Sequence, residues 1–275
     1  MTDAKRSKKL GHTLCILVFC LFSPFAATVA ETKMVSSLCK ISHPGDAGIE
    51  WECRRVRSGE TIEGLFGERW KDVLRFNRVD RRHARPGVYL KVPKRLDDIR
   101  DFTPMPSYYE PSATDPKFIL IDLSEQFLGA YEYGRLAFSS PIATGERGNE
   151  TPNGEFRITA YDKGHRSSLY PIEKTSIPYP MNYGLRFHIN KRGVSFWIHG
   201  RDLPGYPASH GCVGLYDEQM QKKYYGFPQT PTLEDARILF EWVISPLSDR
   251  GFNLMQEGPR VLITGRAPRT GSRPS

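Results

Sequence analysis

The chain has 275 residues and a formal net charge of +8, with 39% hydrophobic and 25% charged residues. This composition is that of a globular protein and excludes an intrinsically disordered chain, and the length suits one sizeable domain with a smaller one. The 21 prolines and 24 glycines predict many turns, and therefore short strands rather than long helices.

The first 30 residues have the layout of a secretory signal peptide. Four basic residues precede an apolar stretch at residues 14–22, Pro24 breaks this stretch, and small residues follow up to Ala30. We therefore predict cleavage after Ala30 and a location in the periplasm or cell envelope. The alternative is an uncleaved membrane anchor, because residues 10–30 carry no acidic or basic side chain apart from one histidine over nearly the length of a membrane span.

Export also affects the interpretation of charge and cysteines. Residues 1–30 carry four positive charges and one negative charge, so the mature chain keeps about +5. An exported basic protein meets anionic envelope polymers first, and we expect no nucleic-acid partner. In an oxidising compartment Cys39 and Cys53, 14 residues apart, are predicted to form a disulfide. Once the two signal-peptide cysteines are removed, Cys212 is left as an unpaired thiol, which is either reactive or destined for an intermolecular bridge.

Residues 53–95 form a predicted α+β unit, after a loop-rich lead-in over residues 31–52. Their hydrophobic pattern and turn residues predict the order strand, helix, helix, strand. The unit resembles a LysM glycan-binding module, a resemblance carried by residues 56–61, Asn77 and residues 86–93. The resemblance implies binding to glycan strands that contain N-acetylglucosamine. The alternative is a small packing domain without a ligand.

A proline-rich linker at residues 96–116 is not expected to hold a regular element, and a mainly β domain is predicted at residues 117–265. Short apolar stretches separated by turns predict a sandwich or a barrel. Apolar spacing over residues 233–244 predicts a helix, and residues 260–264 a final strand. Residues 266–275 are expected to be a disordered tail.

A reactive thiol at Cys212 is predicted from the residues around it. The thiolate is the nucleophilic form of cysteine, and a neighbouring imidazole raises the thiolate fraction by accepting the proton. His210 is two residues away, so on a strand both side chains would project from one face. His199 ends an apolar strand and precedes Gly200, a natural place for a group that points into a cleft. Gly211 lets backbone amides approach a developing oxyanion.

The same residues permit two other interpretations. Together they offer nitrogen and sulfur ligands for a metal ion, although only His210 and Cys212 have short ligand spacing. Alternatively, the cysteine is a core residue and the histidines are ordinary hydrogen-bonding side chains. The four residues that a metal site would use are His188, His199, His210 and Cys212.

Three segments in order resemble the catalytic domain of the L,D-transpeptidase family of the YkuD type. The resemblance covers roughly residues 117–215 and implies a β-sandwich, a cysteine-dependent acyltransferase, and no metal or organic cofactor. A preceding LysM-like module is a common arrangement in this family. The segments are residues 118–123 with their hairpin, Thr144-Gly145 with residues 151–156, and Ile198-His199-Gly200 with residues 209–213.

The family implies a role for each matching residue. Cys212 attacks the carbonyl that precedes the terminal D-amino acid of a peptidoglycan stem tetrapeptide. His199 accepts the thiol proton, while its other ring nitrogen is held by a backbone carbonyl such as that of Gly200. D-Alanine leaves, and the acyl group passes from the thioester to an amine of a second stem or of a wall-linked protein. The amides of Gly211 and Cys212 stabilise the oxyanion, with three supporting side chains: Ser209, His210 and Tyr183.

This sequence departs from the family pattern in two places. The family usually has Arg two residues after the cysteine, where this chain has Gly214. Another cation must then hold the substrate carboxylate, and Arg201 and Arg186 are the candidates. Only nine residues separate His199 from Ser209, fewer than the family usually has, so residues 201–208 are expected to form a tight lid.

The partners implied by these resemblances are peptidoglycan stem peptides and glycan strands, and we expect a monomer. Two other functions fit the same sequence. Water as the acceptor would make the protein an L,D-carboxypeptidase. A lapsed catalytic site would leave a non-catalytic peptidoglycan-binding protein.

Overall fold

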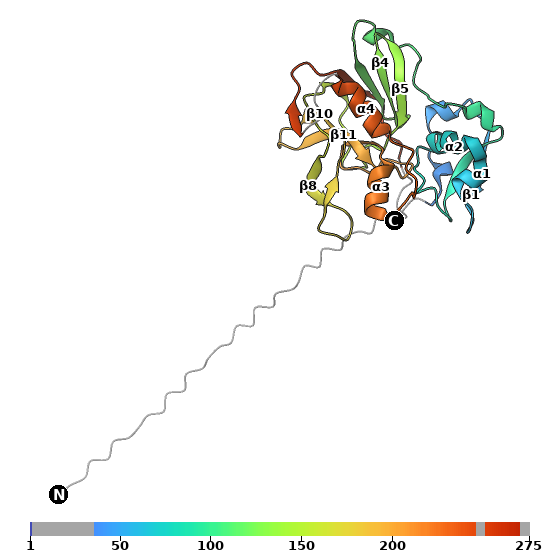
Figure 1. The fold of residues 1–275 in the computed structure, drawn as a ribbon, viewed down its shortest axis with the longest axis horizontal. Helices are drawn as coiled ribbons and strands as arrows, with labels where there is room; N and C mark the ends of the chain where they lie inside the picture. The colour runs from blue at the N-terminus through green and yellow to red at the C-terminus, as the bar shows by residue number, and fades with distance from the viewer. Residues whose placement is uncertain (2–35, 246–250, 270–275) are drawn as a thin grey trace. The chain divides into compact units, whose positions relative to one another are not determined.

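The computed structural model describes Met1, residues 36–245 and residues 251–269. The predicted signal peptide lies outside this part of the chain except for Met1, and so do the last six residues of the predicted tail. Among the described residues, no helix combines the length and hydrophobicity that crossing a bilayer requires. Those from residue 36 onward belong to one compact unit, drawn in colour in Figure 1.

The N-terminal module has the order strand, helix, helix, strand that its sequence predicts. Its two strands pair antiparallel, with Cys53 opposite Lys91. Thr61 begins the first helix, because its hydroxyl accepts a hydrogen bond from the Gly64 amide at 3.1 Å. The elements are β1 (Trp51–Arg55), α1 (Ile62–Phe66), α2 (Trp70–Asn77) and β2 (Tyr89–Pro93), with a 3-10 turn η3 (Gly67–Arg69) between the helices.

The lead-in before the module packs onto it. Cys39 and Cys53 form the predicted disulfide, which ties the lead-in to β1. Leu38 and Ile41 are buried in the module's hydrophobic core. The lead-in also contains two 3-10 turns, η1 (Leu38–Lys40) and η2 (Pro44–Asp46).

Residues 96–116 also have more structure than their prolines predict. Two 3-10 turns form there, and Pro111 is compatible with the second because the first positions of a helical turn need no backbone donor. Phe102 is buried, and its ring meets Phe76 of α2 and Phe127 edge-on at centroid distances of 5.2 and 5.9 Å. The linker therefore joins the module to the following domain through one continuous core. The turns are η4 (Leu96–Ile99) and η5 (Glu110–Ser112).

The domain that follows is mainly β, as predicted, and contains two five-stranded sheets. One has the strand order β5-β4-β3-β14-β6 and the other β12-β11-β10-β7-β13. Apolar side chains from both sheets, such as Ile119 and Ile198, share one buried core. A separate two-stranded hairpin is formed by β8 and β9. The strands are β3 (Phe118–Asp122), β4 (Phe127–Glu132), β5 (Arg135–Pro141), β6 (Gly154–Arg157), β7 (Ala160–Asp162), β8 (Arg166–Pro171), β9 (Pro178–Pro180), β10 (Gly184–Ile189), β11 (Ser195–Arg201), β12 (Val213–Tyr216), β13 (Phe252–Leu254) and β14 (Arg260–Thr264).

The helix predicted near the C-terminus is present as α4 (Asp235–Ile244), two residues shorter at its start. Its apolar face is buried in the core shared by the two sheets, where it packs against β11 and β12. The predicted final strand is β14, which pairs parallel with β3 and antiparallel with β6. The sequence did not predict α3 (Glu218–Tyr225), which begins at the end of β12 and is capped by Asp217.

Candidate active site

Cys212 lies in a loop that leads into β12, at the edge of the second sheet. It is half-buried and is the one free cysteine among the described residues. Strand β12 runs parallel to β11, with Val213 opposite Ile198 and Gly214 opposite His199. The pairing therefore places the strand that follows Cys212 directly next to the strand that carries His199. The two segments of the predicted signature are therefore joined by strand pairing.

His199 is buried at 4% exposure and has the geometry of a general base. Its Nδ1 donates a hydrogen bond to the Gly200 carbonyl at 2.8 Å, as expected from the family. Since a carbonyl only accepts, Nδ1 carries the proton and Nε2 of the neutral ring keeps its lone pair. Burial lowers the pKa of His199 to about 3, against a smaller opposite effect of the Gly200 hydrogen bond. The imidazole is therefore neutral at pH 7 and free to accept a proton.

The Cys212 thiol is also neutral in this state. Burial raises its pKa above the ordinary value, while a hydrogen bond from the Trp197 backbone and the positive charge of Arg201 lower it by less. The thiol of Cys212 and the imidazole of His199 are therefore both neutral and do not form an ion pair in this state. Proton transfer must accompany the attack of the sulfur on a substrate.

Ser209 shapes the loop that carries the nucleophile. Its hydroxyl donates to the Cys212 carbonyl at 2.6 Å and accepts from the Gly211 amide at 3.1 Å. The Gly211 amide, expected to serve the oxyanion, is thus engaged with Ser209, which leaves Cys212 as the remaining expected donor. Gly211 itself has φ +111°, and a Cβ there would lie 2.4 Å from a ring carbon of Phe196. Glycine is required at this position for both reasons.

The upstream segment of the signature, Thr144-Gly145 with residues 151–156, forms hydrogen bonds with this loop. Thr151 is buried, and its hydroxyl donates to the Gly211 carbonyl and accepts from the Gly145 amide, both at 2.9 Å. The Thr144 carbonyl accepts from the Ser209 amide at 2.9 Å. The sequence identified this segment by its motif but gave no role to Thr151.

His210 does not share a strand face with Cys212, which corrects that part of the sequence argument. Residues 209–212 form a loop rather than a strand, and the His210 side chain is exposed. Its ring stacks on Tyr170 of β8, with centroids 4.0 Å apart and planes at 12°. His210 therefore attaches the nucleophile loop to the β8–β9 hairpin, and His199 is the residue with the geometry of a base.

Tyr183 is also placed differently from the expectation. Its ring packs edge-on against Phe240 of α4 at 5.8 Å. Burial raises the pKa of its hydroxyl, and the nearby carboxylates of Asp217 and Glu234 raise it further. This side chain faces the core and α4, so the expected contribution to the oxyanion hole is not supported. The signal missed here was its positive φ of 58°, which turns the side chain.

Gly200 lies against the buried carboxylate of Asp217, a residue that the sequence analysis did not identify. A Cβ on Gly200 would lie 2.4 Å from Oδ2 of Asp217. Asp217 accepts a hydrogen bond from the Asn182 side chain at 3.0 Å, and the Asn182 carbonyl accepts from the Gly200 amide at 2.8 Å. This set holds Gly200, whose carbonyl accepts the hydrogen bond from Nδ1 of His199.

Arg201 supplies the positive charge next to the nucleophile. Its side chain runs across Gly214, where a Cβ would lie 1.9 Å from its Cδ and 2.0 Å from its Cγ. Its guanidinium donates to the carbonyls of Asp202 at 3.1 Å and Ala208 at 3.3 Å. The other candidate cation, Arg186, lies over the rings of Trp197 and Phe252 instead. The missing side chain at position 214 is therefore what makes room for Arg201.

The residues considered for a metal site are not gathered as ligands. His188 lies against the rings of Phe156 and Phe196, with centroids 5.1 and 5.5 Å away. Within the part of the chain that the structure describes, no three His, Cys, Asp or Glu side chains are grouped closely enough to hold a metal ion.

The loop at residues 201–208 is tight, as expected, but it is covered by the N-terminal module. Leu203, Gly205 and Pro207 are buried in it. A Cβ on Gly205 would lie 2.6 Å from Leu38 of the lead-in. This loop is a packed connection between module and sheet rather than a free lid.

Comparison with known proteins finds one family model that resembles the domain after the linker. Residues 116–244, just under half of the chain, match the model of the YkuD L,D-transpeptidase catalytic domain. No curated protein matches the chain. Among solved structures, an L,D-transpeptidase from Stackebrandtia nassauensis is 20% identical over 74% of this chain and 69% of its own, with a TM-score of 0.39. One from Xylanimonas cellulosilytica is 20% identical over 78% and 98%, also with a TM-score of 0.39.

L,D-transpeptidase 1 from Mycobacterium tuberculosis is 14% identical over 54% of this chain, with a TM-score of 0.34, and the chain covers 60% of that protein. These likenesses are too distant to carry an argument, so the assignment rests on the family model. Residues 116–244 of this chain are therefore similar to the L,D-transpeptidase catalytic domain of the YkuD type.

Proposed function

We propose that the protein is a peptidoglycan L,D-transpeptidase that forms a thioester between Cys212 and a stem tetrapeptide. The observation that carries this proposal is the state of His199. Its neutral ring is held by the Gly200 carbonyl at 2.8 Å, and its free Nε2 belongs to a strand paired directly with the strand after Cys212. A neutral thiol with a neutral imidazole at its side is the reactant pair for general-base nucleophilic catalysis.

The reaction then proceeds in two balanced steps. His199 Nε2 takes the thiol proton as Sγ attacks the carbonyl that precedes the terminal D-alanine, and the Cys212 amide stabilises the oxyanion. The imidazolium returns the proton to the departing amine, so D-alanine leaves and a thioester remains. An acceptor amine attacks the thioester, His199 takes its proton, and the thiol is regenerated. One peptide bond is broken and one is formed, so no external energy source is needed.

In this proposal Arg201 holds the carboxylate of the terminal D-amino acid. Its positive charge acts on Cys212 and lies over Gly214, beside the nucleophile. A guanidinium is suited to carboxylates because it offers several N–H donors in one plane.

The test is incubation with a disaccharide-tetrapeptide, with products and protein followed by mass spectrometry. Wild type should release D-alanine and form a cross-linked dimer. Cys212→Ser, which keeps the size of the side chain, should do neither, and a covalent adduct should appear on the wild type alone. Release of D-alanine with only a tripeptide product would make the protein an L,D-carboxypeptidase. No release by wild type would leave a peptidoglycan-binding protein and reject the catalytic proposal.

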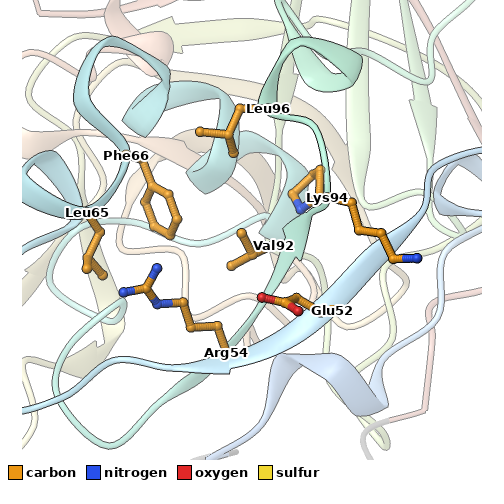
Figure 2. Close-up of a pocket in the computed structure, with 8 residues that line it drawn as sticks. Glu52, Arg54, Leu65, Phe66, Val92, Lys94 and Leu96 are labelled. Carbon is orange, nitrogen blue, oxygen red and sulfur yellow. The ribbon is translucent and has the colours of Figure 1, made fainter.

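We also propose that the N-terminal module is a LysM-like glycan-binding module. A shallow pocket of about 320 Å³ lies between its sheet and α1 (Figure 2). Phe66 and Leu65 offer apolar surface, and Glu52 and Arg54 lie on the facing strand, as Figure 2 shows. Apolar and aromatic surface with a few polar groups is the usual lining of a small-ligand site. Residues 51–95 carry 13 basic and six acidic residues, which adds attraction to an anionic wall.

Sedimentation with insoluble peptidoglycan tests the pocket. Replacing both Glu52 and Arg54 by alanine should weaken binding while leaving the net charge unchanged. The matched control replaces Glu68 and Arg57, which are exposed residues of the module outside the pocket. Equal loss in both variants would mean that the pocket is not the glycan site.

Export to the periplasm or cell envelope is the remaining part of the proposal. It is supported by the signal-like sequence of residues 1–30 and by the disulfide between Cys39 and Cys53, since such bonds persist in oxidising compartments. The mass of the protein purified from envelope fractions should correspond to a chain that begins at Glu31. A full-length mass in the membrane fraction would indicate an uncleaved anchor instead.

A further inference from the structure

A segment of the N-terminal module, residues 79–83, forms hydrogen bonds with the loop that follows β11, the strand that carries His199. Asp80, just after α2, is fully buried, and its carboxylate accepts a hydrogen bond from the Leu203 amide at 2.6 Å. The Asp80 amide donates in return to the Leu203 carbonyl at 2.9 Å. Val79 forms a β-bridge with Pro204. Both the backbone amide and the backbone carbonyl of Leu203, four residues after His199, are therefore hydrogen-bonded to the module.

Asp202 connects this module segment to the site. One of its carboxylate oxygens accepts from the Tyr179 hydroxyl of β9 at 2.6 Å. The other accepts from Arg82 of the module at 2.5 Å, and the ring of His83 lies 3.7 Å from the same oxygen. Arg82 is itself fixed, because its guanidinium lies 4.2 Å from the centre of the Tyr225 ring. Three separate elements thus meet at one carboxylate.

Asp202 also lies next to the residues around the nucleophile. It follows Arg201, the cation whose charge acts on Cys212. Tyr179, which Asp202 holds by its hydroxyl, packs against the same small cluster of Ala160, Met181 and Trp197 as Cys212 does. A continuous series of contacts therefore runs from the module through Asp202 to the two side chains beside the thiol.

We propose that residues 79–83 of the N-terminal module are a positioning element of the catalytic site, which acts through Asp202 on Arg201 and Tyr179. The module is then required for the reaction of Cys212 even with a soluble peptide that carries no glycan. Asp80 and Arg82 touch neither substrate nor sulfur and act only through the loop after β11. This inference rests on the proposed function for its activity readout, but not for its measurement on the thiol.

The charges around Asp202 predict that two substitutions shift the pKa of the Cys212 thiol in opposite directions. Burial alone raises the pKa of Asp202, but the charges of Arg201, Arg82 and His83 and the Tyr179 hydrogen bond outweigh it, so the pKa is held well below its ordinary value. The Asp202 charge also acts on two further titratable groups, Tyr225 and His199, and raises the pKa of both. Removing the Arg82 charge leaves the Asp202 carboxylate less compensated, which raises the pKa of the Cys212 thiol. Removing the Asp202 charge has the opposite effect.

The experiment compares the full chain with Arg82→Gln, Arg82→Lys and Asp202→Asn. The control is Arg69→Gln, since the Arg69 side chain has an exposure of 26%, similar to the 28% of Arg82, and pairs with Asp97 of the linker rather than with Asp202. Alkylation of the Cys212 peptide by iodoacetamide is followed by mass spectrometry across pH, and D-alanine release is measured on a soluble tetrapeptide.

At pH values below the midpoint of the pH–rate curve, the alkylation rate is proportional to the thiolate fraction, which changes tenfold for each pKa unit. In that range alkylation should be about two- to threefold slower in Arg82→Gln and faster by a similar factor in Asp202→Asn. D-Alanine release should fall about fivefold or more in Arg82→Gln, in proportion to lost orientation, and recover largely in Arg82→Lys. Arg69→Gln should behave as wild type.

Two results would overturn the positioning role. One is equal behaviour of Arg82→Gln and Arg69→Gln on the thiol. The other is a shift in the same direction for Arg82→Gln and Asp202→Asn, which is what simple loosening of the fold produces. If wild type releases no D-alanine while the alkylation rates still move in opposite directions, the proposed reaction fails and the positioning role stands.

Discussion

Replacing Gly214 by alanine should test why this chain has no side chain at the second position after the nucleophile. The new methyl group would lie about 2 Å from Cγ and Cδ of Arg201, a distance that no pair of unbonded carbons can adopt. These carbons lie in the middle of the Arg201 side chain, so the whole side chain must move away from its position across Gly214. Overpacking of this kind costs about 1–3 kcal/mol, and each lost hydrogen bond of the guanidinium adds about 1 kcal/mol. With both guanidinium hydrogen bonds lost, we therefore expect a loss of about 3–5 kcal/mol in the free energy of unfolding.

A double-mutant cycle isolates the contact. Arg201→Ala loses the hydrogen bonds to Asp202 and Ala208, but it empties the position across Gly214. Alanine at position 214 should then cost little, because Gly214 lies in a regular strand and has no positive φ. The four proteins are compared by urea unfolding, and the coupling energy should be favourable by at least about 1 kcal/mol. Additive losses would show that Gly214 and Arg201 do not exclude each other, and would refute the reasoning.

The same cycle separates stability from chemistry. Both single variants should lose release of D-alanine, because each moves positive charge away from Cys212. The double variant should regain stability without regaining activity.

Three further predictions concern the support of the site. Thr151→Val should lower the free energy of unfolding by about 2–4 kcal/mol, since it leaves the Gly211 carbonyl and a buried amide unpaired, and Thr151→Ser should not; urea unfolding distinguishes them. Because the folded pKa of His199 is about 3 and the unfolded one 6.5, its contribution to stability is fully present above pH 6.5 and is lost as pH falls toward 3. The stability difference between wild type and His199→Asn should therefore change over that window with a slope approaching about 1.4 kcal/mol per pH unit, and a difference independent of pH would contradict the assignment. Replacing Cys39 and Cys53 by serine should cost about 2–5 kcal/mol, measured by thermal or urea unfolding, and an unchanged midpoint would mean that the bond does not restrain the unfolded chain.

Local patterns in the sequence predicted much of the chemistry. A thiol between glycine and an apolar strand, and a histidine at the end of another such strand, indicated nucleophile and base because strand pairing is the simplest way to join two such segments. The disulfide followed from two cysteines in an exported chain. The strand and helix order of the module followed from hydrophobic spacing, and so did α4. The disulfide, the element order of the module and α4 are confirmed, because each depends on a few neighbouring residues, whereas the nucleophile and base stay predictions.

Side-chain direction and long-range contact were decided by the tertiary structure alone. His210 was assigned to a strand face but stacks on Tyr170, because its loop is held by Ser209 rather than by a sheet ladder. Arg82 and Asp202 are 120 residues apart, and nothing in either neighbourhood indicates that they meet. The sequence by itself determined which groups are able to react. Which groups surround them depends on how the module packs against the domain, since burial and electrostatic fields arise from all elements together and not from any one stretch of chain.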